Sequence, residues 1–339
     1  MSTATAPRSA LMVQRGGLGQ IVRGAIGSRP VQLIILMVAF AAIALVMNPS
    51  LFTYRVLANV LITAMVTGFV AMGQLLVLIT RGIDLSVAPI LGLSAVIVGF
   101  QAQDHGMTLV PGLFLGALVG CVLGVGNGLL VAVAKMPPII ATLATFSIYS
   151  GLMFVVTGGD QVNAIPDEFT RWGVVSNRLL GLPPLFWAGL GAMVLIALVL
   201  RRTVFGRNLY AVGGDATEAV RLGIPARRVI FLAYVCCGAL AGIAGVVYLM
   251  RTGSADAVTG VQTNENLYAI AAGLVGGASL AGGRGTAGGA MVGAIFLSLA
   301  LTAMGSAFGV PPVWQPAGVG LLILAAVLLD LRGRRTERR

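Results

Sequence analysis

The residue types that most often carry chemistry are scarce in this chain of 339 residues. Lys135 is the single lysine and His105 is the single histidine. A phosphate-binding P-loop needs a lysine directly after its second glycine, and Lys135 lacks that glycine frame, while one histidine cannot build a His-based zinc site. The three cysteines lie in apolar runs and are expected to be buried thiols without a disulfide: Cys121, Cys236 and Cys237. We therefore expect no catalytic residue, no metal site and no cofactor.

One stretch, residues 283–288, matches the dinucleotide-binding pattern G-x-G-x-x-G. That mechanism needs a preceding strand and a βαβ unit. Here the match lies between two apolar runs, so we interpret it as a tight turn that lets two helices pack closely.

A second stretch, Thr80–Ser86, interrupts a long apolar run with two charges, Arg81 and Asp84. A charged residue at the centre of a bilayer costs roughly 2.5–3.5 kcal/mol on insertion scales. These charges are therefore expected either at the membrane surface, in a turn, or inside the protein as part of a discontinuous helix that lines a polar path. The sequence leaves both readings open.

The long polar segment 201–228 contains the signals of a short amphipathic helix. Asp215 or Thr217 can cap its first turn, and Gly223 ends it before a proline. We expect its apolar side chains to be exposed and to dock to a partner protein, an ordinary structured loop being the alternative. The residues proposed for this coupling surface are Gly214, Asp215, Glu218, Ala219, Arg221, Leu222 and Gly223.

The elements that position these segments are membrane helices. The chain is 58% hydrophobic and 10% charged, whereas soluble domains carry about 25% charged residues. Because a span needs about 20 mainly apolar residues, the sequence predicts an all-α, polytopic bundle of about ten spans. They are expected near 31–47, 57–79, 87–100, 111–133, 138–157, 185–200, 229–250, 266–281, 287–305 and 314–331.

The distribution of positive charge supports ten spans and sets their orientation. With both termini in the cytoplasm, the segments on the cytoplasmic side hold 18 of the 22 basic residues, as the positive-inside rule requires. We therefore expect a cytoplasmic tail over 1–30, a membrane domain over 31–331 and a basic cytoplasmic tail over 332–339. The same placement explains the net charge of +11 without nucleic acid.

Glycine periodicity indicates how the helices pack. Five glycines recur every fourth residue on the predicted helix 111–133, and shorter series of the same kind occur on two later helices. In lipid, helices associate by close backbone approach across such small residues. We expect a tightly packed bundle.

Several segments resemble the ribose-type (monosaccharide) ABC importer permeases over roughly residues 40–331. The likeness is carried by Gly73–Leu78 leading into Gly82–Val87, by Ala141–Thr145 with Thr157–Gly159 behind it, by Gly206–Gly214, and by Ala269–Ala272 followed by Gly276–Gly285. The family usually has Gly-Gly-Ile-Asp where this chain has Arg81 before Gly82, and Gly-Gly-Lys-Gly where Arg284 stands. The first departure bears on the polar path and on the identity of the substrate.

This resemblance implies a subunit of the bacterial inner membrane that works as a two-fold pair, with itself or with a sister permease. It implies an ATP-binding subunit docked in the cytoplasm on the 214–225 helix. An extracytoplasmic solute-binding protein would deliver a small sugar or polyol. Polarity within apolar runs then suggests the residues that line the path: Gln74, Thr80, Asp84, Ser86, Asn127, Thr142, Thr145 and Ser147.

Two other transport functions stay open. One is a permease of the same machinery for branched-chain amino acids or nucleosides. The other is an ion-coupled secondary transporter, a class that usually has acidic residues within the membrane, for which this chain offers Asp84 and Glu265. A membrane-embedded enzyme is disfavoured, because the His, Cys and acidic clusters that its chemistry would need do not occur.

Overall fold

The computed structural model describes residues 29–337, with side chains over 38–328. Within these residues the chain is helical and has only two isolated β-bridges. The predicted tail 1–30 lies almost entirely outside the described residues, as do Arg338 and Arg339. The elements are α2 (Arg29–Met47), η1 (Pro49–Phe52), α3 (Tyr54–Ile79), α4 (Val87–His105), α5 (Leu109–Gly128), η2 (Leu129–Val133), α6 (Pro138–Thr157), α7 (Asp167–Thr170), α8 (Pro184–Arg202), α9 (Val204–Gly214), α10 (Ala216–Arg221), α11 (Ala226–Thr252), α12 (Glu265–Val275), α13 (Ala287–Ser306), η3 (Pro312–Trp314) and α14 (Gln315–Glu337).

Each of the ten predicted segments coincides with a helix in this order. Among the described residues, seven helices are long and apolar enough to cross a membrane: α3, α4, α5 with η2, α6, α8, α11 and α13. The all-helical class is therefore confirmed, while the count of ten spans stays a prediction. Helix α14 continues through residues 332–337, where the sequence predicted a separate tail.

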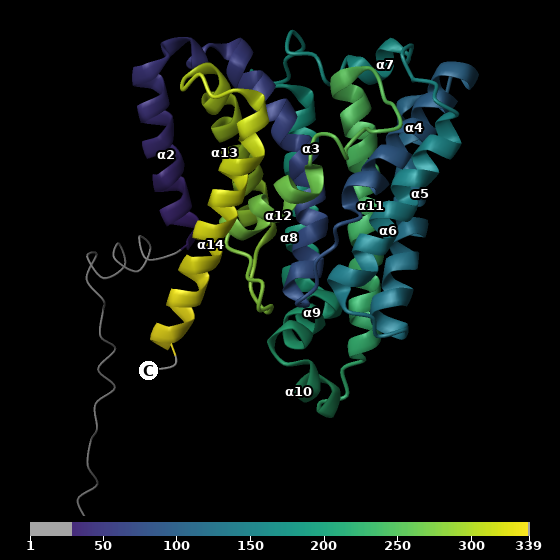
Figure 1. Ribbon diagram of the computed structural model, residues 1–339, viewed down its shortest axis with the longest axis vertical. Coiled ribbons are helices and arrows are strands. Elements are labelled where there is room, and N and C mark those ends of the chain that lie inside the picture. The colour runs from purple at the N-terminus through teal and green to yellow at the C-terminus, as the bar shows by residue number, and fades with distance from the viewer. Residues whose placement is uncertain (1–28, 338–339) are drawn as a thin grey trace, which may run out of the picture.

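The connections between the helices gather at two ends of the bundle (Figure 1). At one end, the side-chain amide of Asn48 donates to the Ser306 carbonyl, and residues 162 and 255 form an isolated bridge. At the other end lie α9 and α10, where the main-chain N–H of Gly283 donates to the Ile79 carbonyl. The long helices thus run alternately up and down, as membrane spans joined by short connections must.

Helices α5 and α11 cross with their backbones in contact, as the glycine series predicted. On α5, the series faces Gly238 and Gly242 of α11, and a Cβ added at Gly120 would overlap the carbonyl oxygen of Gly238. Such a crossing favours van der Waals contact without bulky side chains. It holds the end of α5, which carries Asn127, against the centre of the bundle.

Helix α12 is shorter than the predicted segment 266–281, because it ends at Val275. Gly277 has a φ of 95°, which terminates the helix, and a Cβ at Gly276 would overlap the carbonyl oxygen of Gly289 on α13. Residues 276–286, between α12 and α13, form a loop that packs against the end of α3. The sequence reading was wrong here because an apolar, glycine-rich loop resembles a helix in hydropathy alone.

The close crossing of α5 and α11 yields a test of packing. Replacing Gly120 with Ala forces the two backbones apart, and overpacking of this kind costs about 1–3 kcal/mol. We expect the Gly120→Ala chain, purified in detergent, to unfold at a lower temperature than wild type when followed by circular dichroism. The matched control is Gly151→Ala on α6, where no atom lies within 4 Å of the added Cβ. An unfolding midpoint for Gly120→Ala at or above that of wild type would refute the close crossing.

Candidate functional site

The first candidate site is the loop Thr80–Ser86, which connects α3 to α4. The turn closes where the N–H of Gly82 donates to the Val77 carbonyl. Beyond it, the chain folds back along α3 into the bundle, where Asp84 is fully buried at 0% exposure while Arg81 stays exposed. The two charges that the sequence could not separate therefore lie in different surroundings, one inside the protein and one at its surface.

The carboxylate of Asp84 accepts hydrogen bonds from two neighbouring side chains. The main-chain N–H of Ser86 donates to Oδ1 at 2.9 Å and its hydroxyl donates to the same atom at 2.6 Å. The side-chain amide of Asn127 donates to Oδ2 at 3.2 Å and to the Ser86 hydroxyl at 2.6 Å. Residues from α5 and from the loop thus surround one carboxylate.

Helix α6 and helix α3 complete this buried polar cluster. The Thr145 hydroxyl donates to Asn127 Oδ1 at 2.7 Å, and the Thr142 hydroxyl donates to the carbonyl of Ile83 at 3.2 Å. With its amide oriented to satisfy both groups, Gln74 of α3 pairs with the main-chain N–H and C=O of Asp84 at 3.0 and 3.1 Å. The cluster comprises Gln74, Asp84, Ser86, Asn127, Thr142 and Thr145.

No basic side chain within the described part of the chain forms an ion pair with Asp84. A buried carboxylate is costly unless hydrogen-bond donors replace its water. The donors here come from α5 and from the loop itself, so the loop is stabilised in the one position where they meet. The cluster can orient a polar ligand or change state when the loop moves, but it contains no nucleophile–base pair.

Six of the eight residues that the sequence proposed for the path come together in this cluster, and two do not. Thr80 caps the end of α3, where its hydroxyl donates to the carbonyl of Val77 at 2.8 Å. Ser147 is exposed on α6 and bonds to its own helix at Leu143. Whether any of the eight lines a path stays a prediction.

A second buried carboxylate lies away from this cluster. Glu265, the first residue of α12, is 5% exposed and accepts a hydrogen bond of 3.1 Å from the Thr67 hydroxyl of α3. Both acidic residues that the sequence offered for ion coupling are therefore inside the protein. Buried acidic residues of this kind are typical of ion-coupled transporters, so the ion-coupled alternative retains support.

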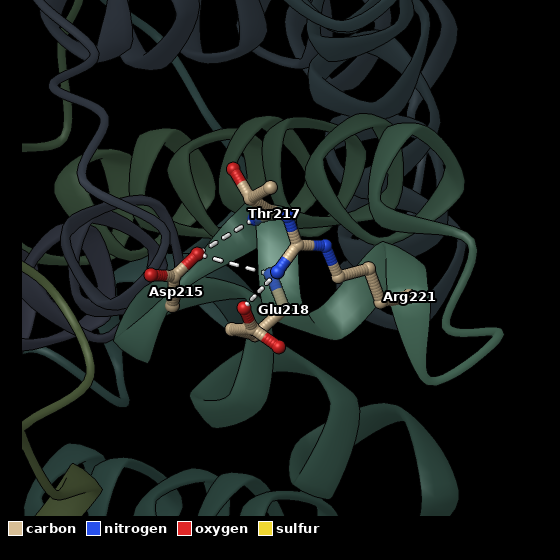
Figure 2. A network of polar contacts seen from close by, with 4 residues as sticks. All are labelled: Asp215, Thr217, Glu218 and Arg221. Atoms are coloured by element: carbon tan, nitrogen blue, oxygen red, sulfur yellow. Dashed lines mark hydrogen bonds and ion pairs between the residues drawn. The ribbon is translucent and has the colours of Figure 1, made fainter.

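The second candidate site is the pair of short helices α9 and α10, at the end of the bundle opposite α7 (Figure 1). Figure 2 shows how α10 begins: the Asp215 carboxylate accepts hydrogen bonds from the main-chain N–H groups of Thr217 at 2.8 Å and Glu218 at 3.1 Å. Asp215 is therefore the N-cap, which decides between the two residues that the sequence allowed. These N–H groups, with Arg81 and Arg221 nearby, hold the pKa of Asp215 below its usual value.

Helix α10 presents part of the predicted apolar face. Val220 is 57% exposed, and Leu222, the residue directly after α10, is 79% exposed. The ion pair between Arg221 and Glu218 also lies on the surface. The prediction that the side chain of Ala219 is exposed was wrong. Ala219 is 2% exposed, because its face of the helix packs toward α9 and α11. A methyl group on the inward face lets this short helix lie close to its neighbours.

Sequence reasoning missed α9. Its signals are present, since the Thr203 hydroxyl caps the helix by accepting from the N–H of Gly206, and Leu209 and Val212 are buried at helical spacing. Leu209 and Val212 anchor α9 beneath the bundle. The structure thus places α10 on a folded support.

Comparison with known proteins agrees with the resemblance. Residues 56–327 match the family model described as branched-chain amino acid transport system / permease component. No solved structure matches the chain significantly.

Among curated proteins, the autoinducer 2 import system permease protein LsrC of Klebsiella pneumoniae subsp. pneumoniae is 35% identical over 88% of this chain and 85% of its own length. The protein of the same name from an Enterobacter species is 34% identical over 91% and 88%. A probable ABC transporter permease protein, y4mJ, of Sinorhizobium fredii is 38% identical over 77% and 76%.

The buried cluster predicts an energetic coupling between Asn127 and Asp84. Replacing Asn127 with Ala leaves a buried charge short of donors, at a cost of about 3 kcal/mol, whereas Ser147→Ala is expected within about 0.5 kcal/mol of wild type. Since removing both partners leaves no unpaired charge, the Asp84→Ala/Asn127→Ala double variant should be less destabilised than the sum of the single variants, by about 0.5–3 kcal/mol. Unfolding in detergent is measured for wild type, both single variants, the double variant and the Ser147→Ala control, and strict additivity would contradict the cluster.

Proposed function

The chain belongs to the permease family described as branched-chain amino acid transport system / permease component, and we propose that it is the membrane subunit of an ATP-driven importer for a small sugar-like solute. The observation that carries this proposal is the match over residues 56–327, which takes in both candidate sites. Relatives named as import-system and ABC transporter permeases support the same function.

The proposed cargo is a small polyhydroxylated solute. Several relatives are named for the import of autoinducer 2, so this compound is the first to test, with ribose as the second. A neutral polyol needs hydrogen-bonding groups along its path, and the cluster around Asp84 gathers such groups inside the bundle. We propose that Gln74, Asp84 and their partners border the path that the solute takes.

The proposed orientation has ten spans and both ends in the cytoplasm of a bacterial inner membrane. It puts α9 and α10 on the cytoplasmic side, together with most of the basic residues. It also puts the loop Thr80–Ser86 at that side, beside α9. The connections at the opposite end of the bundle, including α7, would face the outside and meet a solute-binding protein.

We propose that α10 is the docking element for the ATP-binding subunit. Its exposed apolar side chains, Val220 and Leu222, suit a groove on a partner, and the surface ion pair beside them adds polar contacts at the rim. A second permease chain, either a copy of this one or a sister permease, would complete the assembly, as the resemblance implies. Residues 1–339 lack the P-loop lysine frame, so in this proposal ATP is hydrolysed by the partner subunit.

Two alternatives are tied to particular observations. The family description names branched-chain amino acids, so leucine is the proper competitor to a sugar in binding assays. The buried Glu265 is the residue that favours ion coupling, and uptake driven by an ion gradient would establish that class.

Reconstitution in proteoliposomes tests the function directly. We expect uptake of autoinducer 2 or ribose only when ATP, the cognate ATP-binding subunit and the solute-binding protein are all present. ATP is supplied on the side of α10, and the binding protein on the opposite side. Omitting any one component should reduce uptake to the level of empty liposomes.

Accumulation driven by a proton or sodium gradient without ATP would refute an ATP-driven importer. Uptake of leucine under the full conditions, with no uptake of either sugar-like compound, would retain the machinery and replace the cargo.

The orientation has its own test. In a chain whose three natural cysteines are replaced, Val220→Cys should react with a membrane-impermeant maleimide only after the cells are opened, because α10 faces the cytoplasm. Leu180→Cys, which is 84% exposed near α7 at the other end, should react in intact cells. Labelling of Val220→Cys in intact cells would reverse the topology and remove α10 from reach of ATP.

A further inference from the structure

Helix α3 ends in a hydrogen-bonded turn that normally requires glycine. The N–H of Gly82 donates to the Val77 carbonyl and the N–H of Arg81 donates to the Leu78 carbonyl, which are the two bonds of a Schellman motif. Arg81 occupies its left-handed position with a φ of 66°. A residue with a side chain is unfavourable there, so an arginine at this position calls for an explanation in what its side chain does.

The guanidinium of Arg81 binds the end of α9. Its Nε donates to the carbonyl of Gly213 at 2.9 Å, and one terminal nitrogen donates to the carbonyl of Gly214. These carbonyls are at the C-terminus of α9, where they have no partner within the helix and carry its negative dipole end. A cation held by two such acceptors fixes the loop to α9.

Backbone contacts at the same place make the junction tight. A Cβ at Gly213 would overlap the carbonyl oxygen of Ile79 and lie 2.7 Å from the nitrogen of Gly283. The hydroxyl of Tyr210 on α9 donates to the carbonyl of Gly285 at 2.7 Å. The end of α9 therefore rests directly on the end of α3 and on the loop 276–286, with no side chains between them.

We propose that Arg81 is a positioning residue that transmits movement of α10 to the buried cluster around Asp84. Gly214 directly precedes the N-cap of α10, and Asp84 follows Arg81 by three residues. Beside the backbone contacts of α9 with Ile79, the side chain of Arg81 thus links the docking element to the loop that carries the buried carboxylate. This inference rests on the proposed function of α10 as the site where the ATP-binding subunit docks.

The geometry favours transmission over simple anchoring of the loop. The loop is held on its inner side by the hydrogen bonds to Asp84, and Arg81 restrains its outer side, so loss of the Arg81 side chain should loosen the loop without unfolding it. The Arg81 side chain reaches across an exposed surface to a different element. It therefore adds a connection between two units that each fold around their own contacts.

The test compares Arg81→Gly with Lys135→Gly in the complete complex of permease, ATP-binding subunit and solute-binding protein. Glycine suits the φ of 66° at Arg81, so the variant loses the side chain without straining the turn. Lys135 is the matched control: it is also basic, also left-handed at 57°, and also follows the end of a membrane helix. Arg81→Lys, which keeps the charge but not the fork of donors, should rescue only in part.

We expect Arg81→Gly to lower ATP-dependent uptake of autoinducer 2 about tenfold, within the range of about 5- to 150-fold typical of coupling between sites. The amount of ATP-binding subunit that co-purifies should stay at the wild-type level, as should basal ATP hydrolysis. Hydrogen exchange at the amides of residues 80–86 should become faster. Lys135→Gly should match wild type in all of these measurements.

Wild-type uptake by Arg81→Gly would overturn the proposal, and so would loss of the ATP-binding subunit from the complex, because Arg81 would then serve docking. If the wild-type complex shows no ATP-driven uptake, the proposed function fails. Hydrogen exchange then still tests whether Arg81 links α9 to the loop Thr80–Ser86. Unchanged exchange at residues 80–86 in Arg81→Gly would overturn it, while faster exchange there, absent in Lys135→Gly, would support it.

Discussion

The burial of one carboxylate, Asp84, for which residues 38–328 provide no counter-charge, is the constraint around which the rest of the structure is arranged. Asp84 must receive its hydrogen bonds from Ser86 and Asn127, because neither water nor lipid can supply them in the core of a bundle. Asn127 is in reach only because the glycine face of α5 lies directly on α11. The close crossing of α5 and α11 and the folded-back loop therefore depend on each other. Without the crossing, the buried carboxylate of Asp84 would lose the hydrogen bonds from Asn127.

Much of the fold follows from hydropathy and charge, but the site does not. The ten apolar segments predicted the long helices to within a few residues, since proline and glycine fix where helices such as α6 and α8 begin and where α4 ends. Burial of Asp84 could not be decided from its neighbours, because the donors that permit it come from residue 127 and from the loop's own fold. Hydropathy also failed at α12, where the apolar residues after Val275 form a packed loop.

The short helices α9 and α10 illustrate a different limit of sequence-based prediction. The start of α10 could be predicted because capping chemistry is local, and Asp215 is indeed the N-cap. Ala219 was misplaced because the inward face of a six-residue helix depends on what supports it. That support is α9, whose amphipathic spacing was overlooked within a segment taken as one polar connection.

The two sites are joined at the end of α3, and this position has a physical consequence. A permease that is driven by a partner can respond to it only if two of its states differ little in free energy and the partner binds them differently. A dry core packed through glycine contacts resists gradual deformation, so change must concentrate at a joint. This joint is the loop Thr80–Ser86. On its inner side Asp84 accepts hydrogen bonds from neutral donors, and on its outer side Arg81 donates to main-chain carbonyls of α9. Because coupling between sites is reciprocal, any arrangement of this loop that a partner bound at α10 would favour must in turn favour the binding of that partner.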